Sequence, residues 1–327
     1  MKARVRMDNT AFEPKKLSKS IRKKKSLRRR IFDSRYLYLL ALPAILYILV
    51  IKILPIWGLS IAFVEYNPFI GLKSIIQGPF IGFSVFKEVF GDKMFPKMVI
   101  NTLAINSLGL VFLFPIPIIL SIMLNEVRSN KFKRVTQTLV YFPHFVSWVV
   151  VVSLTMFLFS ADIGLINKLR VSLGMDPVMI MSTPKYFWGM VVGQQVWRET
   201  GWGTIIILAA ITGIDQQLYE AARIDGANRL QQIWSITLPS IASTIIILLI
   251  MRIGKMADVS LEQLLLMQNP LVYNVSEVFD TFAYNMGITQ GFVSVGVAVG
   301  LFKSVINMFF VVGANIIVRR AGHEGIY

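Results

Sequence analysis

Long apolar runs are the feature of this sequence that most limits its possible folds. A helix needs about 20 mainly apolar residues to cross the roughly 30 Å hydrocarbon core of a membrane. The 327-residue chain contains six segments of this kind, and only 16% of its residues are charged. We therefore predict an all-α, polytopic membrane protein with six transmembrane helices in one membrane domain. The predicted spans are residues 36–63, 98–124, 136–159, 186–211, 241–259 and 292–318.

The uneven distribution of basic residues predicts the orientation of the chain. Fourteen of the 34 Lys and Arg residues precede Tyr36, and the densest run covers residues 22–30. With the N-terminus inside, the cytoplasmic segments hold 22 basic residues and the three outer loops hold 7, as the positive-inside rule requires. We expect both termini to be cytoplasmic and the tail, residues 1–35, to contact anionic membrane lipid. A nucleic-acid-binding tail is disfavoured because the basic run contains no aromatic residue.

The composition excludes several kinds of catalytic site. The chain has no cysteine, and its two histidines, His144 and His323, are far apart in the sequence. Neither a thiolate site nor a histidine metal cluster is therefore expected. A phosphate-binding loop needs Gly-x-x-x-x-Gly-Lys followed by Ser or Thr. The nearest segment, residues 296–304, has the wrong spacing, so we predict no metal, no bound cofactor and no enzymatic activity for this chain.

The loop at residues 212–239, between the fourth and fifth predicted spans, carries the most informative motif. Asp215 is a good N-cap for a short helix over residues 216–225. Gly226 supplies the left-handed residue that commonly ends such a helix. A second short helix follows, and we predict that it stops at Pro239, because proline cannot continue a helix from its interior.

The same loop resembles the EAA signature of binding-protein-dependent ABC importer permeases. That signature has Glu-Ala-Ala, then Gly, then Ile-x-Leu-Pro at a fixed distance, and every one of these positions matches in register. The extended form Glu-Ala-Ala-x-x-Asp-Gly-Ala is similar to the carbohydrate-uptake class. Residues 197–202 are also similar to this class, and residues 262–263, 269–270 and 325–327 resemble the polysaccharide and oligosaccharide branch. The matching residues are Glu220, Ala221, Ala222, Asp225, Gly226, Ile236, Leu238 and Pro239.

The resemblance implies an architecture and a set of partners. It implies the type I ABC importer transmembrane fold in a bacterial cytoplasmic membrane, with the permease domain over residues 36–320 and a short tail at 321–327. A core five-helix unit would cover residues about 97–318. The partners would be a second permease subunit, two ATP-binding subunits and an extracellular solute-binding protein. ATP would be bound only by the partner subunits.

The resemblance also implies roles for the loop residues. The helix of the EAA motif would lie in a groove on one ATP-binding subunit and transmit its closure to the spans. Glu220 would offer a carboxylate to a basic residue of that subunit. Gly226 would permit the tight turn, while Ala221 and Ala222 would let the partner backbone approach closely.

Polar groups at bilayer depth are candidates for the substrate pathway, because an ionisable group is costly there. Arg198 lies near the middle of the fourth predicted span, and Lys303 lies near the middle of the sixth. Alternatively, Arg198 pairs with the adjacent Glu199 and only holds helices together, and the tryptophans only pack. The candidate pathway residues are Gln194, Trp197, Arg198, Trp202, Asn285, Lys303 and Asn307.

These observations predict ATP-driven import of an oligosaccharide. The intramembrane cations raise the narrower hypothesis that the cargo carries carboxylates. Two alternatives stay open: an ion-coupled secondary transporter, which would need no ATP-binding partner, and an ABC permease for a solute that is not a sugar. A membrane-embedded enzyme is disfavoured because the sequence shows no nucleophile–base set.

Overall fold

The computed structural model describes residues 34–161, 164–323 and 325–326. Within this part of the chain the regular structure is helical, apart from one isolated antiparallel bridge. The prediction for the basic tail, residues 1–35, falls almost entirely outside the described residues. The all-α fold class is confirmed.

The chain divides into two compact units at Trp57, and each is described by itself. One apolar helical stretch, Arg35–Phe63, contains the described residues of the first unit from Arg35 onward and is long enough to cross a membrane. Most of its side chains are exposed, as expected for a helix that faces lipid. Its segments are α2 (Arg35–Tyr47), the π-helical turn η1 (Ile48–Ile53) and the 3₁₀ segment η2 (Leu54–Phe63).

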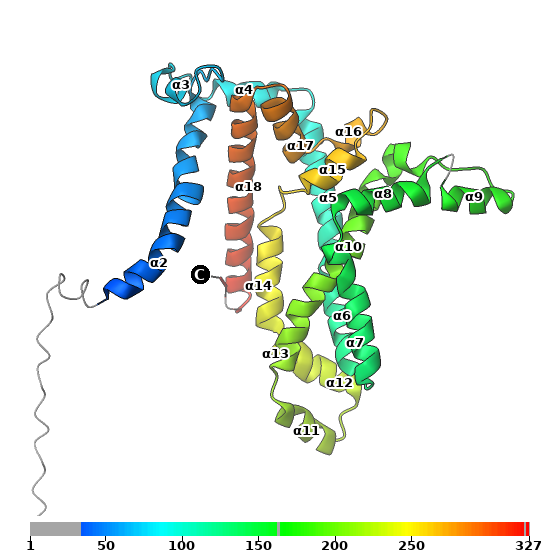
Figure 1. Ribbon diagram of the computed structural model, residues 1–327. Coiled ribbons are helices and arrows are strands. Elements are labelled where there is room, and N and C mark those ends of the chain that lie inside the picture. Colours follow the sequence, from blue (N-terminus) through cyan, green and yellow to red (C-terminus); the bar gives the residue numbers. More distant parts are fainter. Residues whose placement is uncertain (1–33, 162–163, 324, 327) are drawn as a thin grey trace, which may run out of the picture. The chain divides into compact units, whose positions relative to one another are not determined.

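The second unit, from Gly58 onward, is a bundle of long and short helices (Figure 1). In Figure 1 α11 lies at one end of this unit, and α4 and α17 lie near the opposite end. Its elements are α3 (Leu72–Gln77), α4 (Ser84–Gly91), α5 (Phe95–Leu113), α6 (Pro115–Glu126), α7 (Asn130–Tyr141), η3 (Phe142–Phe145), α8 (Trp148–Phe159), α9 (Leu165–Ser172), η4 (Ile180–Ser182), α10 (Pro184–Thr212), α11 (Gln216–Ile224), α12 (Arg229–Gln232), η5 (Ile233–Thr237), α13 (Leu238–Ser240), α14 (Ala242–Ile253), α15 (Leu261–Met267), α16 (Tyr273–Ser276), α17 (Phe279–Tyr284), η6 (Asn285–Thr289) and α18 (Val293–Arg320).

Several helices have the length and composition of membrane spans. Among the described residues, Arg35–Phe63, Phe95–Glu126 and Val293–Arg320 qualify individually, and the number rises to 5 if each bent helix pair is one span. The 29-residue helix α10 occupies the fourth predicted span. Its polar residues lower its hydropathy, so it is not among the helices that qualify. The count of six spans is consistent with these helices and stays a prediction.

The third predicted span is bent, and the helix of the fifth is shorter than predicted. The third is divided between α7 and α8, which meet at 101°. Pro143 lies at this break, where its missing N–H and its ring disfavour a continuous helix. Ser147 then caps α8 by accepting a bond from the N–H of Val150. The fifth predicted span reaches only to Ile253, because the helix ends at Gly254.

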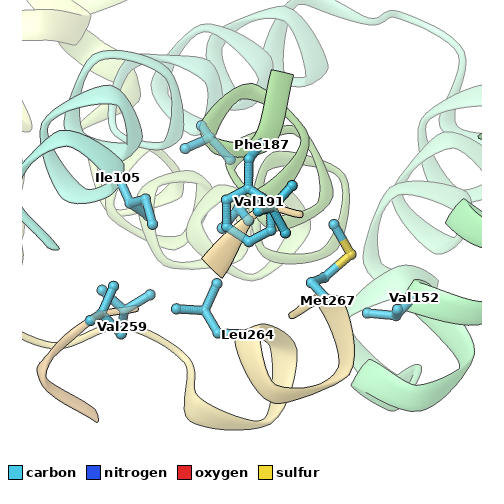
Figure 2. Packing of buried hydrophobic residues seen from close by; sticks show 10 residues of the cluster. Ile105, Val152, Phe187, Val191, Val259, Leu264 and Met267 are labelled. Carbon is cyan, nitrogen blue, oxygen red and sulfur yellow. The ribbon is translucent and has the colours of Figure 1, made fainter. Parts of the chain in front are cut away.

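The core of the bundle is built around α10. Phe187 and Val191 of α10 are at most 1% exposed and pack with Ile105 of α5, Val152 of α8 and Leu264 of α15 (Figure 2). Lipid is as apolar as these side chains, so close packing and hydrogen bonds between helices stabilise such a bundle more than burial from water does.

Candidate functional site

The loop after α10 folds into α11, a short helix with clearly defined ends. Asp215 is its N-cap, and its carboxylate accepts a hydrogen bond of 2.9 Å from the N–H of Gln217. Gly226 follows the helix with a φ of +78°, and the N–H of Ala227 donates to the carbonyl of Ala222 at 2.8 Å. Because other residues are strained at such a φ, the predicted helix, cap and terminating glycine are all confirmed.

The segment after α11, residues 229–240, stays helical beyond Pro239, where the second loop helix was predicted to stop. The helix continues through η5 into α13, which contains Pro239 and ends at Ser240. Proline is tolerated here because it lies in α13 directly after the π-helical turn η5, where the regular hydrogen bonding of an α-helix is already interrupted. The prediction that Pro239 ends the helix was therefore wrong, and the chain instead turns by 61° into α14 after Ser240.

Two side chains anchor this loop to the C-terminal end of α10. Tyr219 of α11 and Ile236 of η5 pack against a cluster of buried isoleucines. The Tyr219 hydroxyl also forms a hydrogen bond of 2.9 Å with the hydroxyl of Thr237. A displacement of α11 would therefore also move the side chains packed at the end of α10. The buried isoleucines are Ile207, Ile211, Ile214 and Ile241.

The opposite side of the loop is an exposed, partly apolar face. Ile224 is 87% exposed, Leu230 68% and Trp234 71%. Glu220 and Ala221 are exposed on α11. Large apolar side chains gathered on a loop outside the bundle indicate an interaction surface. Leu230 and Trp234 are absent from the predicted site, although their spacing of four residues could have suggested a shared helix face.

Arg198, near the middle of α10, is held by contacts within the chain. Its Nε donates to the carbonyl of Val146 at 2.9 Å, and its guanidinium lies 4.7 Å from the centroid of the Trp148 ring. It also forms an ion pair with Glu199. These contacts agree with the alternative in which Arg198 holds helices together, and contact with cargo stays a prediction.

Glu199 connects Arg198 to a stacked pair of rings. Its Oε2 lies 3.1 Å from the Nδ1 of His144. The His144 ring stacks on Trp202, with 4.9 Å between the centroids and 12° between the planes. The structure therefore joins two predicted pathway residues, Arg198 and Trp202, through a carboxylate and a histidine.

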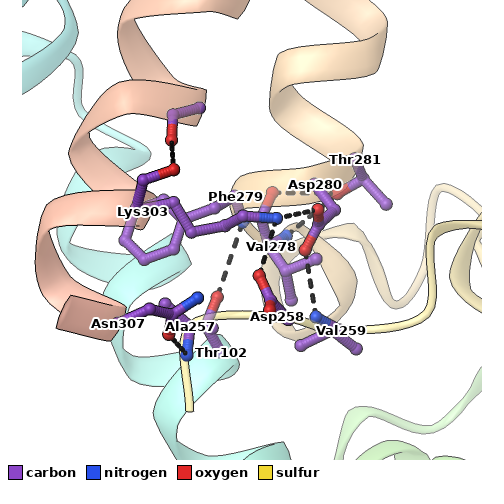
Figure 3. Close-up of polar contacts among 12 residues, drawn as sticks. Thr102, Ala257, Asp258, Val259, Val278, Phe279, Asp280, Thr281, Lys303 and Asn307 are labelled. Atoms are coloured by element: carbon purple, nitrogen blue, oxygen red, sulfur yellow. Dashed lines mark hydrogen bonds and ion pairs between the residues drawn. The ribbon is translucent and has the colours of Figure 1, made fainter. Parts of the chain in front are cut away.

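Lys303 of α18 also forms ion pairs within the chain. Its Nζ forms ion pairs with Asp280 and, at 3.0 Å, with Asp258 (Figure 3). Asn307, one turn later, accepts a bond of 2.9 Å from the N–H of Ala257. Both predicted pathway residues on α18 thus hold the segment that follows α14.

Of the remaining predicted pathway residues, Gln194 and Trp197 line one cavity of about 650 Å³, and Asn285 is not part of its lining. Gln194 is buried, where its Nε2 donates to Thr155 and its Oε1 accepts from Gln263, each at 2.8 Å. Trp197 is 47% exposed on α10. Asn285 begins η6, in the predicted outer loop between the fifth and sixth spans. No functional role of these three residues is decided by their placement.

A polar cavity of about 280 Å³ lies among α5, α8, α10 and the end of α14. A neighbouring cavity of about 350 Å³ shares Leu113, Glu199 and Arg252 with it. The sequence pattern gave Arg252 no role in the pathway, because spacing alone could not show that it borders a cavity. The polar side chains lining the polar cavity are Asn106, Gln195, Glu199, Arg252, Asp258 and Ser260.

Residues 113–323 match the family described as the binding-protein-dependent transport system inner membrane component. The chain belongs to this family of ABC importer permeases. The matched range contains α10, the loop with α11, and α14. The permease is therefore a membrane-embedded transport component and not an enzyme, as predicted.

The permease resembles curated relatives over nearly its whole length. It is 48% identical to the protein LplB of Bacillus subtilis over 293 residues, covering 90% of this chain and 91% of LplB. It is 44% identical to YteP of Bacillus subtilis, a polygalacturonan/rhamnogalacturonan transport system permease protein, over 305 residues, covering 93% of this chain and 94% of YteP.

A solved structure also resembles the permease over nearly its whole length. A chain of a bacterial alginate ABC transporter, in complex with an alginate pentasaccharide-bound periplasmic protein, superposes with a TM-score of 0.83. It is 34% identical and covers 92% of this chain and 99% of that chain. The predicted type I ABC importer fold is thereby confirmed.

Proposed function

We propose that this permease carries an oligosaccharide with acidic groups into the cytoplasm. YteP belongs to a polygalacturonan/rhamnogalacturonan transport system, and a second similar structure is an ABC transporter involved in import of the acidic polysaccharide alginate. These relatives favour a sugar over another solute, and acidic polysaccharide fragments over simple sugars.

The polar cavity offers groups that suit such a cargo. Asn106 and Gln195 bring amides that can bond to sugar hydroxyls. The ring of Trp148 lies at its wall, with Arg198 stacked on it. Arg252 contributes a cation. Ligand sites commonly combine apolar and aromatic walls with a few polar groups that fix orientation.

The observation that carries the proposal is the double role of α10. Its middle lines the polar cavity through Gln195 and Glu199, and its end holds α11 through the buried isoleucine cluster. A helix is stiff, so a force applied at α11 can reach the cavity walls. An ATP-binding subunit docked on the exposed face of the loop would supply that force.

The loop residues have distinct roles in this proposal. Glu220 presents a carboxylate to the ATP-binding subunit, and Ala221 and Ala222 keep α11 slim enough for a close approach. Asp225 and Gly226 shape the turn after α11. Ile236, Leu238 and Pro239 lead the chain back toward α14, and Ile236 is packed against α10.

The complete importer in this proposal contains more than this chain. A second permease subunit would complete the pathway, two ATP-binding subunits would drive it, and an extracellular binding protein would deliver the cargo. Both termini of the permease would be cytoplasmic, so that α11 faces the ATP-binding subunits.

Uptake by the complete importer in proteoliposomes tests the proposal. The measurement compares an acidic oligosaccharide with ATP enclosed, without ATP, and without ATP under an imposed proton or sodium gradient. We expect uptake only with ATP and the binding protein. Uptake driven by the gradient alone would favour a secondary transporter, and ATP-driven uptake restricted to a non-sugar solute would refute the cargo.

A further inference from the structure

Arg252 lines both the polar cavity and its neighbour and, unlike Arg198 and Lys303, has no ion pair among the described residues. Arg198 pairs with Glu199, and Lys303 pairs with two carboxylates. Among residues 34–161, 164–323 and 325–326, no hydrogen bond or ion pair is found for the Arg252 side chain. A guanidinium at bilayer depth without a hydrogen-bonded or ion-paired partner is costly and marks a functional position.

The surroundings of Arg252 leave the guanidinium accessible from both cavities. Arg252 lines the polar cavity and its neighbour. A β-carbon at Gly109 of α5 would lie 2.9 Å from Nη2 of Arg252, so the glycine makes the room that the guanidinium occupies. Lys255, three residues later, lines the neighbouring cavity and also has no ion pair among the described residues.

The carboxylates near Arg252 are already engaged by other groups. Glu199 lines both cavities, but its two oxygens face Arg198 and His144. Asp258 lines the polar cavity and is paired with Lys303. Arg252 therefore lies beside both cavities and Lys255 beside the second, and in the described part of the chain no carboxylate forms an ion pair with either of them.

We propose that Arg252, with Lys255 beside it, binds a carboxylate of the passing cargo and selects for acidic sugars. This inference rests on the proposed function and names the residue that recognises the acidic group. A guanidinium can bind a carboxylate through two parallel hydrogen bonds. The carboxylate of the cargo would form the ion pair that is not found for Arg252 within the described residues, and a neutral sugar would leave Arg252 without one.

The test compares a uronate oligosaccharide with its methyl ester, which has the same size but no charge. Initial ATP-dependent uptake of each is measured with the complete importer in proteoliposomes, carrying wild-type permease, Arg252→Gln or Arg252→Lys. For Arg252→Gln we expect the ratio of acid to ester uptake to fall at least about tenfold, as loss of one charge-assisted bond predicts. Arg252→Lys should retain a larger part of that ratio.

Chemical restoration of the charge separates recognition from a structural role. The permease has no cysteine, so Arg252→Cys introduces one thiol into it. Modification with a cationic thiosulfonate should raise the acid-to-ester ratio again, and an anionic reagent of similar size should not. The complex with wild-type permease, treated identically, controls for cysteines in the partner subunits.

Each outcome decides the inference. Equal losses for acid and ester in Arg252→Gln, or equal effects of the two reagents, would overturn recognition of the carboxylate by Arg252. Wild-type uptake of the ester as fast as that of the acid would overturn it too. If the wild-type complex shows no ATP-dependent uptake of either sugar, the proposed function itself fails, and the inference fails with it.

Discussion

A β-carbon at Gly201 would lie only 2.2 Å from the carbonyl oxygen of Val140, so α10 and the end of α7 meet backbone to backbone. The neighbouring atoms are also main-chain atoms, among them the α-carbon of Tyr141 at 2.9 Å. Main chain cannot rotate away as a side chain can. Even one methyl group at this position must therefore separate the two helices.

The first prediction is that Gly201→Ala destabilises the permease. Overpacking of a close contact typically costs about 1–3 kcal/mol, and here a backbone shift is required. We expect a lower midpoint of thermal unfolding for the purified protein in detergent, together with a lower yield.

Gly189→Ala on the same helix is the matched control. Nothing lies within 4 Å of a β-carbon built at Gly189, and alanine is the better helix former by roughly 0.5–1 kcal/mol. Gly189→Ala should therefore be neutral or slightly stabilising. Equal thermal midpoints for the two variants would show that the contact between Gly201 and Val140 is not tight.

The second prediction concerns the ion pairs of Lys303. Lys303→Met would leave Asp280 and Asp258 facing each other without their shared cation. Removing one partner of a buried ion pair typically lowers the free energy of unfolding by about 3–5 kcal/mol. Because the Asp258 side chain is partly exposed, we expect a cost near the lower end of this range. Thermal unfolding in detergent measures it.

A double variant distinguishes loss of the pair from general damage to the bundle. Lys303→Met combined with Asp280→Leu replaces both charges by apolar side chains, an exchange that is often nearly neutral. We expect the double variant to be more stable than Lys303→Met alone. Strictly additive losses would contradict a direct interaction between Lys303 and Asp280.

The third prediction is a pH dependence caused by Glu277, which lies in the predicted outer loop. Its side chain is fully buried, and Oε2 accepts a bond of 2.9 Å from Gln268. Oε1 has no hydrogen-bond partner in the described part of the chain. Burial raises the pKa of the Glu277 carboxyl.

The raised pKa fixes the sign of the effect. The folded protein holds a proton on Glu277 at pH values where the unfolded chain has lost it, so stability falls as pH rises from the ordinary carboxyl range through the raised pKa. The thermal midpoint of wild type should decline over that range, and Glu277→Gln should show a smaller decline. Parallel pH profiles would mean that Glu277 is not the responsible group.

Local signals in the sequence predict much of this fold. The apolar runs give the positions of α2, α5 with α6, α10 and α18, because a lipid-facing helix needs little besides length and apolar surface. The cap at Asp215 and the turn at Gly226 predict α11, since both act within a few residues. These features depend on neighbours in the sequence.

Long-range pairing explains what the sequence does not predict. The sequence suggests the pair of Arg198 with the adjacent Glu199, but the partners of Lys303, Asp258 and Asp280, come from segments that only the fold brings near. The position of Arg252 beside a cavity depends in turn on Gly109, on another helix. Proline signals a break but not its angle, so the bend at Pro143 is clear only in three dimensions.

The most direct test of the coupling role of α11 is recovery of the ATP-binding subunits with the permease. The test variant is Glu220→Lys, at an exposed position of α11. The control is Glu88→Lys, because Glu88 is also exposed on a short helix, α4, which lies at the opposite end of the second unit. Both variants should unfold at the same temperature as wild type. We predict that Glu220→Lys lowers recovery of the ATP-binding subunits and ATP-dependent uptake at least about tenfold, equivalent to ~1.4 kcal/mol, and that Glu88→Lys preserves both. Unchanged recovery and uptake with Glu220→Lys would contradict the docking of an ATP-binding subunit on this helix.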